Sequence, residues 1–187
     1  MRRALVAASL AAACAGPGSL RVSVAEGATF ELQPPASFGR SVALEQVVHF
    51  RGADVERSLH CLLEIEPGEL RLVGLTAFDT PAFRVVLREG ELDVEDLAGG
   101  ALPVDPRRIL ADLQLALWPQ VQFLDGLEVR ERTEGGESVR ELLRGGRTIV
   151  SVRRSAGEPW SKPLEYRHFE RGYVLTVETL RCDTLAP

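Results

Sequence analysis

Alternating hydrophobic and polar positions run through most of the chain after its first forty residues and predict a series of short strands. In SVALEQVVHF, one face of an extended segment carries the apolar side chains of Val42, Leu44, Val48 and Phe50. The same period of two resumes after the short turns RGAD, EPGE and REGE, and such even spacing is typical of an antiparallel meander. The strands predicted in this first half cover 41–50, 57–66, 69–75 and a hairpin over 82–96 around Glu89-Gly90.

One segment has helical rather than strand periodicity. Residues 105–120, DPRRILADLQLALWPQ, repeat apolar positions every three or four residues. Asp105 is a favourable N-cap, Pro106 suits the first helical position, and Pro119 ends the pattern. We therefore predict one helix between two runs of about five strands, the second run covering 127–133, 137–143, 147–154, 163–169 and 172–181.

This order of elements predicts a mainly β (α+β) protein in which a single helix covers a sheet. A sheet with one apolar face must bury that face against another layer, and about ten antiparallel strands tend to curl or close. We therefore expect an antiparallel, unclosed β-barrel with the helix as a lid. An apolar space between lid and sheet would suit an acyl chain. The candidate lining residues are Leu44, Leu63, Leu72, Leu75, Val85, Leu113, Leu117 and Trp118.

The start of the chain carries a separate signal. Arg2 and Arg3 precede the apolar run ALVAASLAAA, which is shorter than the about 20 residues of a membrane-spanning helix and fits a secretory signal. Small residues then lead directly to Cys14, which resembles a bacterial lipobox. The predicted organisation is a signal peptide over 1–13, an acylated Cys14 with a lipid-anchored tether over 14–37, and a single domain over 38–183. An ordinary secretory signal with an incidental Cys14 is the alternative.

Composition and charge narrow the functional classes. The chain has 187 residues, is 45% hydrophobic and carries a formal net charge of −5, which suits one folded domain. Removal of residues 1–13 makes the charge more negative by two, because Arg2 and Arg3 are lost. An acidic body argues against a nucleic-acid partner and against broad electrostatic adhesion to anionic lipid.

Few residue patterns suggest catalysis or metal binding. The sequence has no G-x-S-x-G elbow, no glycine-rich phosphate loop and no HExxH motif, so we expect neither an enzyme nor a cofactor. His49 and His60 become cross-strand neighbours if their strands pair around residues 54 and 55, which would allow a metal site. Their face also carries Ser41 and Glu64. A polar surface pair is therefore the preferred interpretation, with no metal.

The two cysteines beyond residue 14 leave two alternatives open. Cys61 and Cys182 could form a disulfide in an oxidising compartment. The preferred interpretation is that Cys61 is a small core residue on a strand and Cys182 a free thiol near the chain end.

A family resemblance rests on three stretches of sequence. These are LADLQLALWP, the preceding GELRLVGLTAFDTPAFRVVLREGELDVE and the following RGYVLTVETL. Together, within roughly residues 38 to 181, they resemble a family of uncharacterised Gram-negative lipoproteins similar to LolB, the outer-membrane receptor for lipoprotein sorting. The resemblance implies an unclosed barrel with a helical lid and an apolar cavity for acyl chains.

The same resemblance implies a membrane-contacting residue. In LolB a protruding apolar residue between early strands helps to place cargo in the membrane, and the matching position is Phe78, within TAFDTP. An aromatic side chain there can enter the membrane interface. The alternative is that Phe78 packs back onto the sheet.

These observations lead to two functional hypotheses. The first is a monomeric lipoprotein, anchored at the outer membrane through Cys14 and facing the periplasm, that binds and transfers a lipid, lipoprotein or acylated amphiphile. A periplasmic LolA-like carrier is the expected donor. The second is a structural or assembly lipoprotein that binds a protein partner and has no ligand cavity. The space between residues 106–118 and the sheet separates the two hypotheses.

Overall fold

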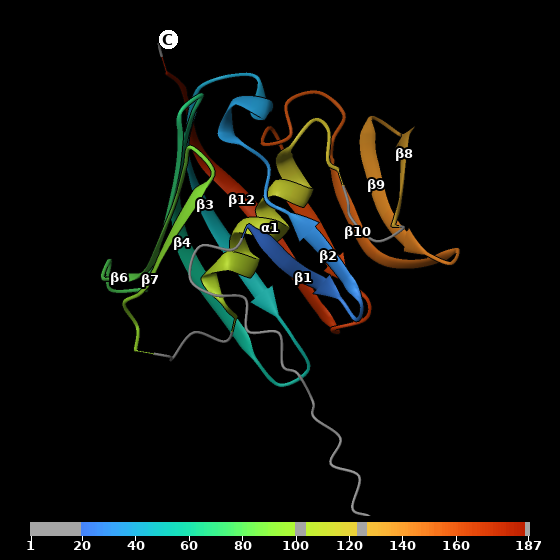
Figure 1. The fold of residues 1–187 in the computed structure, drawn as a ribbon, viewed down its shortest axis with the longest axis horizontal. Helices are drawn as coiled ribbons and strands as arrows, with labels where there is room; N and C mark the ends of the chain where they lie inside the picture. Colours follow the sequence, from blue (N-terminus) through green and yellow to red (C-terminus); the bar gives the residue numbers. More distant parts are fainter. Residues whose placement is uncertain (1–19, 100–103, 123–126, 186–187) are drawn as a thin grey trace, which may run out of the picture.

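A large antiparallel sheet, one helix and a small hairpin make up the fold (Figure 1). The structure is a computed structural model, and it describes residues 20–99, 104–122 and 127–185. The strands of the large sheet are β3 (Val42–Arg51), β4 (Glu56–Glu66), β5 (Glu69–Leu75), β6 (Pro81–Arg88), β7 (Glu91–Asp96), β8 (Glu128–Glu134), β9 (Glu137–Arg144), β10 (Arg147–Ser155), β11 (Leu164–His168) and β12 (Tyr173–Thr184). The other elements are β1 (Arg21–Ala25), β2 (Ala28–Glu31), the 3₁₀ helix η1 (Pro35–Phe38) and α1 (Pro106–Leu117). The predicted mainly β fold with one helix is confirmed.

The last strand of the chain lies in the middle of the large sheet. The spatial order is β7-β6-β5-β4-β3-β12-β11-β10-β9-β8, so β12 pairs with β3 on one side and with β11 on the other. Strands β7 and β8, which precede and follow α1 in the sequence, are the two edges. Among the described residues the predicted ten strands are confirmed, but the sheet is not closed and is not a true barrel.

The alternating pattern decides which face of each strand is buried. Strand β4 places Cys61, Leu63 and Ile65 in the core, while Leu62 and Glu64 between them are exposed. Burying every second side chain in this way contributes roughly 1.5–3 kcal/mol for each large aliphatic residue. The inward faces of the strands therefore form one continuous apolar layer under the helix.

A glycine on β5 makes room for an aromatic ring on its neighbour. A Cβ atom added at Gly74 would lie 2.1 Å from Cε1 of Phe83, and the two residues are opposite each other in the β5–β6 register. Phe83 is fully buried. The ring occupies the space that any larger residue at position 74 would need.

Helix α1 lies across the apolar face of the sheet (Figure 1). It begins as predicted, with the Asp105 carboxylate accepting a hydrogen bond from the Arg107 backbone N–H at 2.9 Å and with Pro106 in the first turn. It ends at Leu117, and Trp118 is extended and fully buried. No helix within the described part of the chain is long and apolar enough to cross a membrane.

The hairpin β1–β2 is part of the folded core, although it lies within the segment that we expected to be a tether. Val24, Phe30 and Leu32 are almost completely buried, and the Leu32 N–H donates to the Leu20 carbonyl at 2.8 Å. Figure 1 shows the hairpin lying beside α1, on the same side of the sheet. The ordered fold therefore begins well before residue 38.

The register of β3 and β4 separates the two surface histidines. His49 lies opposite Ser58 and His60 lies opposite Val47, so the two rings are not the cross-strand neighbours that pairing around residues 54 and 55 would give. His49 Nδ1 is 2.8 Å from the Ser58 hydroxyl, and His60 Nε2 is 2.9 Å from Glu45. In the described ranges no group of three or more His, Cys, Asp or Glu side chains could hold a metal ion.

Both described cysteines are free thiols. Cys61 is buried on β4 and Cys182 is exposed on β12. Strand β3 separates these two strands in the sheet. The preferred interpretation of a core cysteine and a free thiol is confirmed, and the alternative of a disulfide between them is wrong for this structure.

Candidate functional site

A small apolar pocket lies between the N-terminal half of α1 and the centre of the sheet. Its volume is about 40 Å³. The helix contributes Ile109 and Asp112 to its wall, and the remaining lining comes mainly from β3, β4 and β12. We call this pocket the apolar slot; its lining residues are Val48, Phe50, Arg57, Leu59, Cys61, Val104, Ile109, Asp112, Tyr173 and Leu175.

An open depression of about 540 Å³ adjoins the apolar slot. It lies between β1, the start of α1, the turn that joins β3 to β4, and the start of β12. The depression and the slot share Phe50, Val104 and Tyr173, so these three residues form a common wall. We call the depression the arginine basin; its lining residues are Val22, Ser23, Phe50, Gly52, Ala53, Val55, Val104, Asp105, Arg108, Arg171 and Tyr173.

Arg108 connects the first turns of the helix to the hairpin and to the sheet. Its Nη1 donates to the Ser23 carbonyl at 3.1 Å and its Nη2 to the Val24 carbonyl at 3.3 Å. Its Nε donates to the Tyr173 hydroxyl at 3.2 Å. Because the side chain is almost fully buried, these contacts satisfy a charge that would otherwise be costly to remove from water.

One turn further along the helix, Asp112 is the buried centre of the same network. The hydroxyls of Tyr166 and Tyr173 donate to its two carboxylate oxygens at 2.6 and 2.5 Å, and Arg108 Nε lies 3.9 Å away. Burial raises the pKa of Asp112 above its usual value, although both hydroxyls and Arg108 act in the opposite direction. Burial and the nearby carboxylate also raise the pKa of both tyrosines, so their hydroxyls stay protonated and donate.

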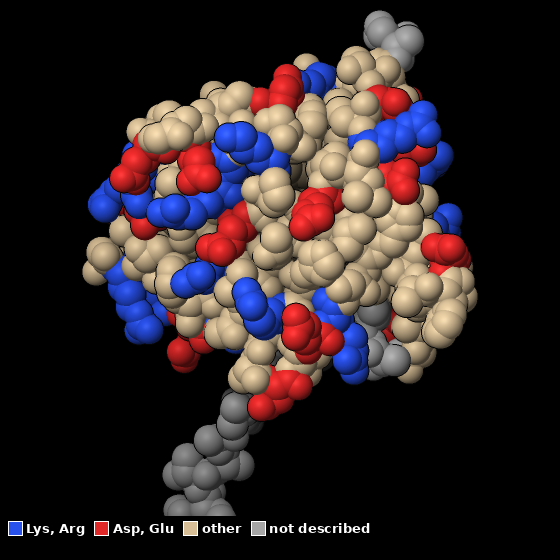
Figure 2. Space-filling view, turned by 180° about the vertical axis from the view of Figure 1, so that it is seen from behind, with Lys and Arg blue, Asp and Glu red and all other residues tan. Residues whose placement is uncertain are grey.

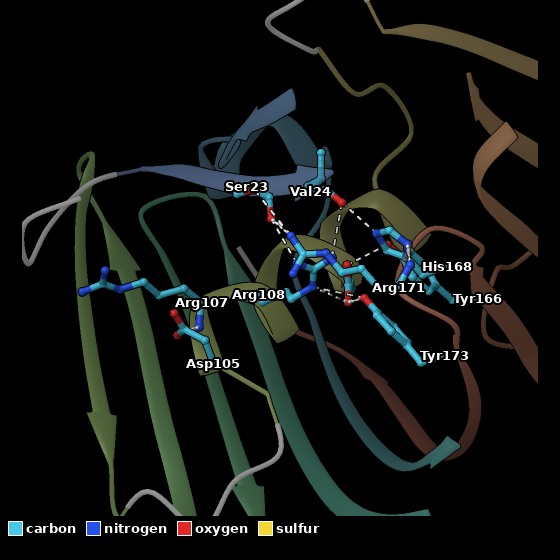
Figure 3. A network of polar contacts seen from close by, with 10 residues as sticks. Ser23, Val24, Asp105, Arg107, Arg108, Tyr166, His168, Arg171 and Tyr173 are labelled. Atoms are coloured by element: carbon cyan, nitrogen blue, oxygen red, sulfur yellow. Dashed lines mark hydrogen bonds and ion pairs between the residues drawn. The ribbon is translucent and has the colours of Figure 1, made fainter. Parts of the chain in front are cut away.

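His168 and Arg171 complete the network on the side of the hairpin. His168 Nε2 donates to the Val24 carbonyl at 2.7 Å, and its Nδ1 accepts from the Arg171 N–H at 3.2 Å. Burial lowers the pKa of His168 to about 4, so the ring is neutral. Figure 3 shows Arg108 and Arg171 side by side, both directed toward Ser23.

The C-terminal half of α1 is held separately, by polar side chains from the sheet and the hairpin. Arg140 on β9 donates to the carbonyls of Leu115, Trp118 and Pro119 at 2.8, 2.7 and 3.1 Å. Leu115 lies in the last turn of the helix, where carbonyls have no partner within the helix, and Trp118 and Pro119 follow that turn directly. Arg154 donates to the carbonyl of Ala116. The helix end is therefore fixed to β9 and β10.

A reciprocal amide pair joins the middle of the helix to the chain after β2. Gln114 accepts from the Gln33 N–H at 2.7 Å and donates to the Gln33 carbonyl at 3.0 Å. Gln114 itself is fully buried. The Gln114–Gln33 pair and Arg140 therefore hold the C-terminal half of the helix, whereas the slot lies under its N-terminal half, near Ile109 and Asp112.

The eight residues predicted to line an acyl cavity lie outside the apolar slot. Leu113 is half-buried on the helix and packs against the core. Leu75 pairs with His60, on the outer face of the sheet. The other six are buried core residues: Leu44, Leu63, Leu72, Val85, Leu117 and Trp118. All six belong to the same hydrophobic core.

Phe78 projects from the turn that joins β5 to β6, with 90% of its surface exposed. Hydrogen bonds hold the turn around it, from the Thr76 N–H to the Thr80 carbonyl at 2.9 Å and from the Asp79 N–H to the Thr76 carbonyl at 3.0 Å. The alternative that Phe78 packs back onto the sheet is therefore wrong. Cys14, the predicted acylation site, lies outside the described residues.

Sequence reasoning missed the slot and the basin, although some signals were present. Val48 and Phe50 were on the inward face of a predicted strand. Arg108 and Asp112 are four residues apart on the helix, a spacing that places them on one face. Nothing in the sequence pairs that face with Tyr166, because the contact depends on the position of β11 beside β12.

The surface opposite the helix carries charges of both signs. Figure 2 shows Lys and Arg side chains interspersed with Asp and Glu side chains on this face. Salt bridges such as Arg84–Glu95 and Arg132–Glu141 join neighbouring strands there. Such a mixed surface differs from the continuous basic patch of a nucleic-acid interface.

Comparison with protein families identifies the family of this chain. A search of curated proteins finds no match to this chain. A family model matches residues 43–181, which span β3 to β12 with the helix between them. The chain belongs to the family described as "Protein of unknown function (DUF3261)".

Proposed function

We propose that this protein binds an amphiphile, a lipid, lipoprotein or other acylated molecule, with its acyl chain entering the apolar slot from the arginine basin. The observation that carries the proposal is a group of apolar side chains that converge under the helix without being fully buried. These are Val48, Phe50, Leu59, Ile109 and Leu175. Large apolar side chains that remain partly accessible in a concave site are typical of ligand pockets.

The slot must widen to accept a chain. Its volume of about 40 Å³ is well below the roughly 150 Å³ of an apolar cavity that holds benzene. The wall shared with the basin is the place where widening costs least, since Phe50 and Val104 are only partly buried. The C-terminal half of the helix stays in place through Arg140.

We further propose that the protein acts at the outer membrane, facing the periplasm, as a monomer anchored through an acylated Cys14. Transfer then exchanges burial of an acyl chain in the protein for burial in the bilayer and needs no covalent chemistry. The open sheet with a helix on its concave face supports a likeness to LolB and a LolA-like donor. The projecting ring of Phe78 supports direct membrane contact.

Ligand retention tests the proposal. The full-length lipoprotein is extracted from its native membrane, purified and analysed for bound lipid by mass spectrometry. We expect acyl chains in excess of those attached to Cys14. Protein that carries only its own anchor, at every detergent concentration tried, would contradict the proposal.

A matched pair of variants on β4 locates the ligand. Leu59→Trp fills the slot, whereas Leu62→Trp adds the same side chain to the outer face of the same strand, where Leu62 is 40% exposed. We expect Leu59→Trp to lose bound lipid and Leu62→Trp to keep it. Circular dichroism confirms that both variants fold. Equal lipid content in the two variants would exclude the slot.

Phe78→Ser tests membrane contact in the same way. Because the side chain is exposed, the substitution should leave the unfolding free energy within about 0.5 kcal/mol of the wild-type value. We expect slower transfer of a fluorescent lipid to vesicles, while Phe169→Ser, at another exposed aromatic position, should transfer at the normal rate.

A second candidate function is a structural or assembly lipoprotein that binds a protein partner without a ligand. The filled interior favours it, since the six buried residues that we expected to line a cavity pack against one another as core. Cross-linking in the native envelope, followed by identification of one partner in stoichiometric amount and no bound lipid, would support this function over the first.

A further inference from the structure

We infer that the polar end of the ligand is an oxyanion on an acyl chain, either a carboxylate or a phosphate, and that Arg171 binds it in the arginine basin. This inference rests on the proposed function and names the class of ligand for the same site. Arg171 is exposed to the basin, whereas its neighbour Arg108 is buried behind it.

The guanidinium group of Arg171 retains N–H groups that can donate to a ligand. Its hydrogen bonds to the carbonyl and the hydroxyl of Ser23, at 3.2 and 3.4 Å, involve Nη2. A guanidinium has five N–H groups in a planar fork that matches two oxygens of a carboxylate or phosphate. The contact with Ser23 orients the fork, because it fixes one nitrogen against β1 (Figure 3).

The charge in the basin favours an anion. Two guanidiniums, those of Arg108 and Arg171, line it, and Asp105 is the one carboxylate among the described lining residues. Desolvation and the charge of Arg108 both lower the pKa of Arg171. Asp112, which faces Arg108 from the slot, already accepts from two tyrosine hydroxyls. A negatively charged ligand would relieve the repulsion between the two arginines.

The position of the basin relative to the slot determines the orientation in which the ligand binds. The shared wall of Phe50, Val104 and Tyr173 lies between Arg171 and the partly exposed apolar side chains of the slot. An acyl chain whose acid end contacts Arg171 therefore directs its tail under α1. Fatty acids present a carboxylate and phospholipid headgroups present a phosphate, so both classes carry such an oxyanion.

Matched ligands distinguish the acid from its neutral counterpart. The full chain is produced with Cys14→Ser, so that no acyl anchor competes, and ligands displace a neutral naphthylamine dye. The carboxylate arm compares palmitic acid with its methyl ester; the phosphate arm compares lysophosphatidic acid with monoacylglycerol of the same chain. We expect at least one acid to bind about tenfold or more tightly than its neutral partner, as a charged hydrogen bond allows.

Variants assign the preference to one residue. Arg171→Gln should bring the affinity for the acid down to that for the neutral ligand, and Arg171→Lys should retain part of the preference. Arg167→Gln, which removes an exposed arginine paired with Glu165 on β11, should have no effect. Unfolding curves confirm that each variant is folded.

The possible results separate this inference from the function on which it rests. Equal binding of acids and neutral ligands overturns the inference and leaves the acyl-binding function standing. A preference that survives Arg171→Gln excludes Arg171 as the binding residue. Failure of every acyl ligand to displace the dye overturns both.

Discussion

The hydroxyl of Tyr166 on β11 donates to the buried carboxylate of Asp112 on α1 at 2.6 Å. This contact joins the helix to the half of the sheet that follows it in the sequence. Since both groups are buried, its loss leaves a carboxylate oxygen without one of its donors.

We expect Tyr166→Phe to destabilise the fold by about 1–3 kcal/mol, the cost of a buried polar group that loses its partner. Urea unfolding at neutral pH measures the change. The same substitution made in an Asp112→Asn background should cost less, because the neutral amide needs the hydroxyl less than the carboxylate does. Identical losses in the two backgrounds would show that the contact contributes little.

Arg140 fixes the C-terminal end of the helix from β9 and is only 1% exposed. We expect Arg140→Met to lower the unfolding free energy by about 1–3 kcal/mol, because it leaves buried carbonyls at the helix end without a donor. Arg130→Met on β8 removes an exposed arginine and serves as the control, with a change within about 0.5 kcal/mol. A similar small effect of both substitutions would contradict the assigned role of Arg140.

His168 makes stability depend on pH. Burial lowers its pKa from 6.5 to about 4 in the folded state, so between these values the unfolded chain binds a proton that the folded chain does not. Stability is therefore fully present above pH 6.5 and decreases as the pH falls toward about 4, by at most about 1.4 kcal/mol per pH unit. Asp112, whose pKa is raised, contributes in the opposite direction.

The His168→Gln variant isolates this contribution, because its amide N–H can still donate to Val24 and does not titrate. Urea unfolding at pH 7, 6, 5 and 4 should give a flatter pH profile for His168→Gln than for the wild type. His49→Gln, at an exposed position, should keep the wild-type slope. Parallel profiles for wild type and His168→Gln would rule out the buried ring as the source.

Gly74→Ala should destabilise the sheet by about 1–3 kcal/mol, because the added methyl group overlaps the ring of Phe83. Combining it with Phe83→Leu should recover part of the loss relative to the sum of the two single changes. Gly68→Ala is a suitable control, since a Cβ there meets no heavy atom within 4 Å. Calorimetric melting temperatures of the wild type and the four variants measure these effects, and equal melting temperatures for Gly74→Ala and Gly68→Ala would contradict the overlap.

Most secondary structure follows from local patterns, and the predicted and observed elements agree closely after residue 40. Asp105 and Pro106 begin the helix as their chemistry requires. The hairpin β1–β2 was missed because Pro and Gly on both sides of it suggested a tether. The alternation of Val22 and Val24 before Glu26-Gly27 was the signal that could have found it.

The site was less predictable because it depends on contacts between distant segments. Apolar alternation identifies inward positions, but it does not show which of them stay partly accessible; Leu44 and Val48 share a face of β3, yet only Val48 lines the slot. Polar residues at inward positions, such as Arg140 and His168, contradict the simple pattern. Arg140 bonds the end of α1 and His168 bonds Val24 on β1, and the sequence pattern does not indicate either contact.

The central position of β12 has a consequence for how the molecule is assembled. Strands β3 to β7 can pair through successive hairpins while the chain is still incomplete, but the free edge of β3 stays open until Tyr173–Thr184 arrives. Contacts between such distant segments form slowly, and an open strand edge invites association with other chains. A nascent or truncated chain lacking this final segment is therefore the species most prone to aggregate.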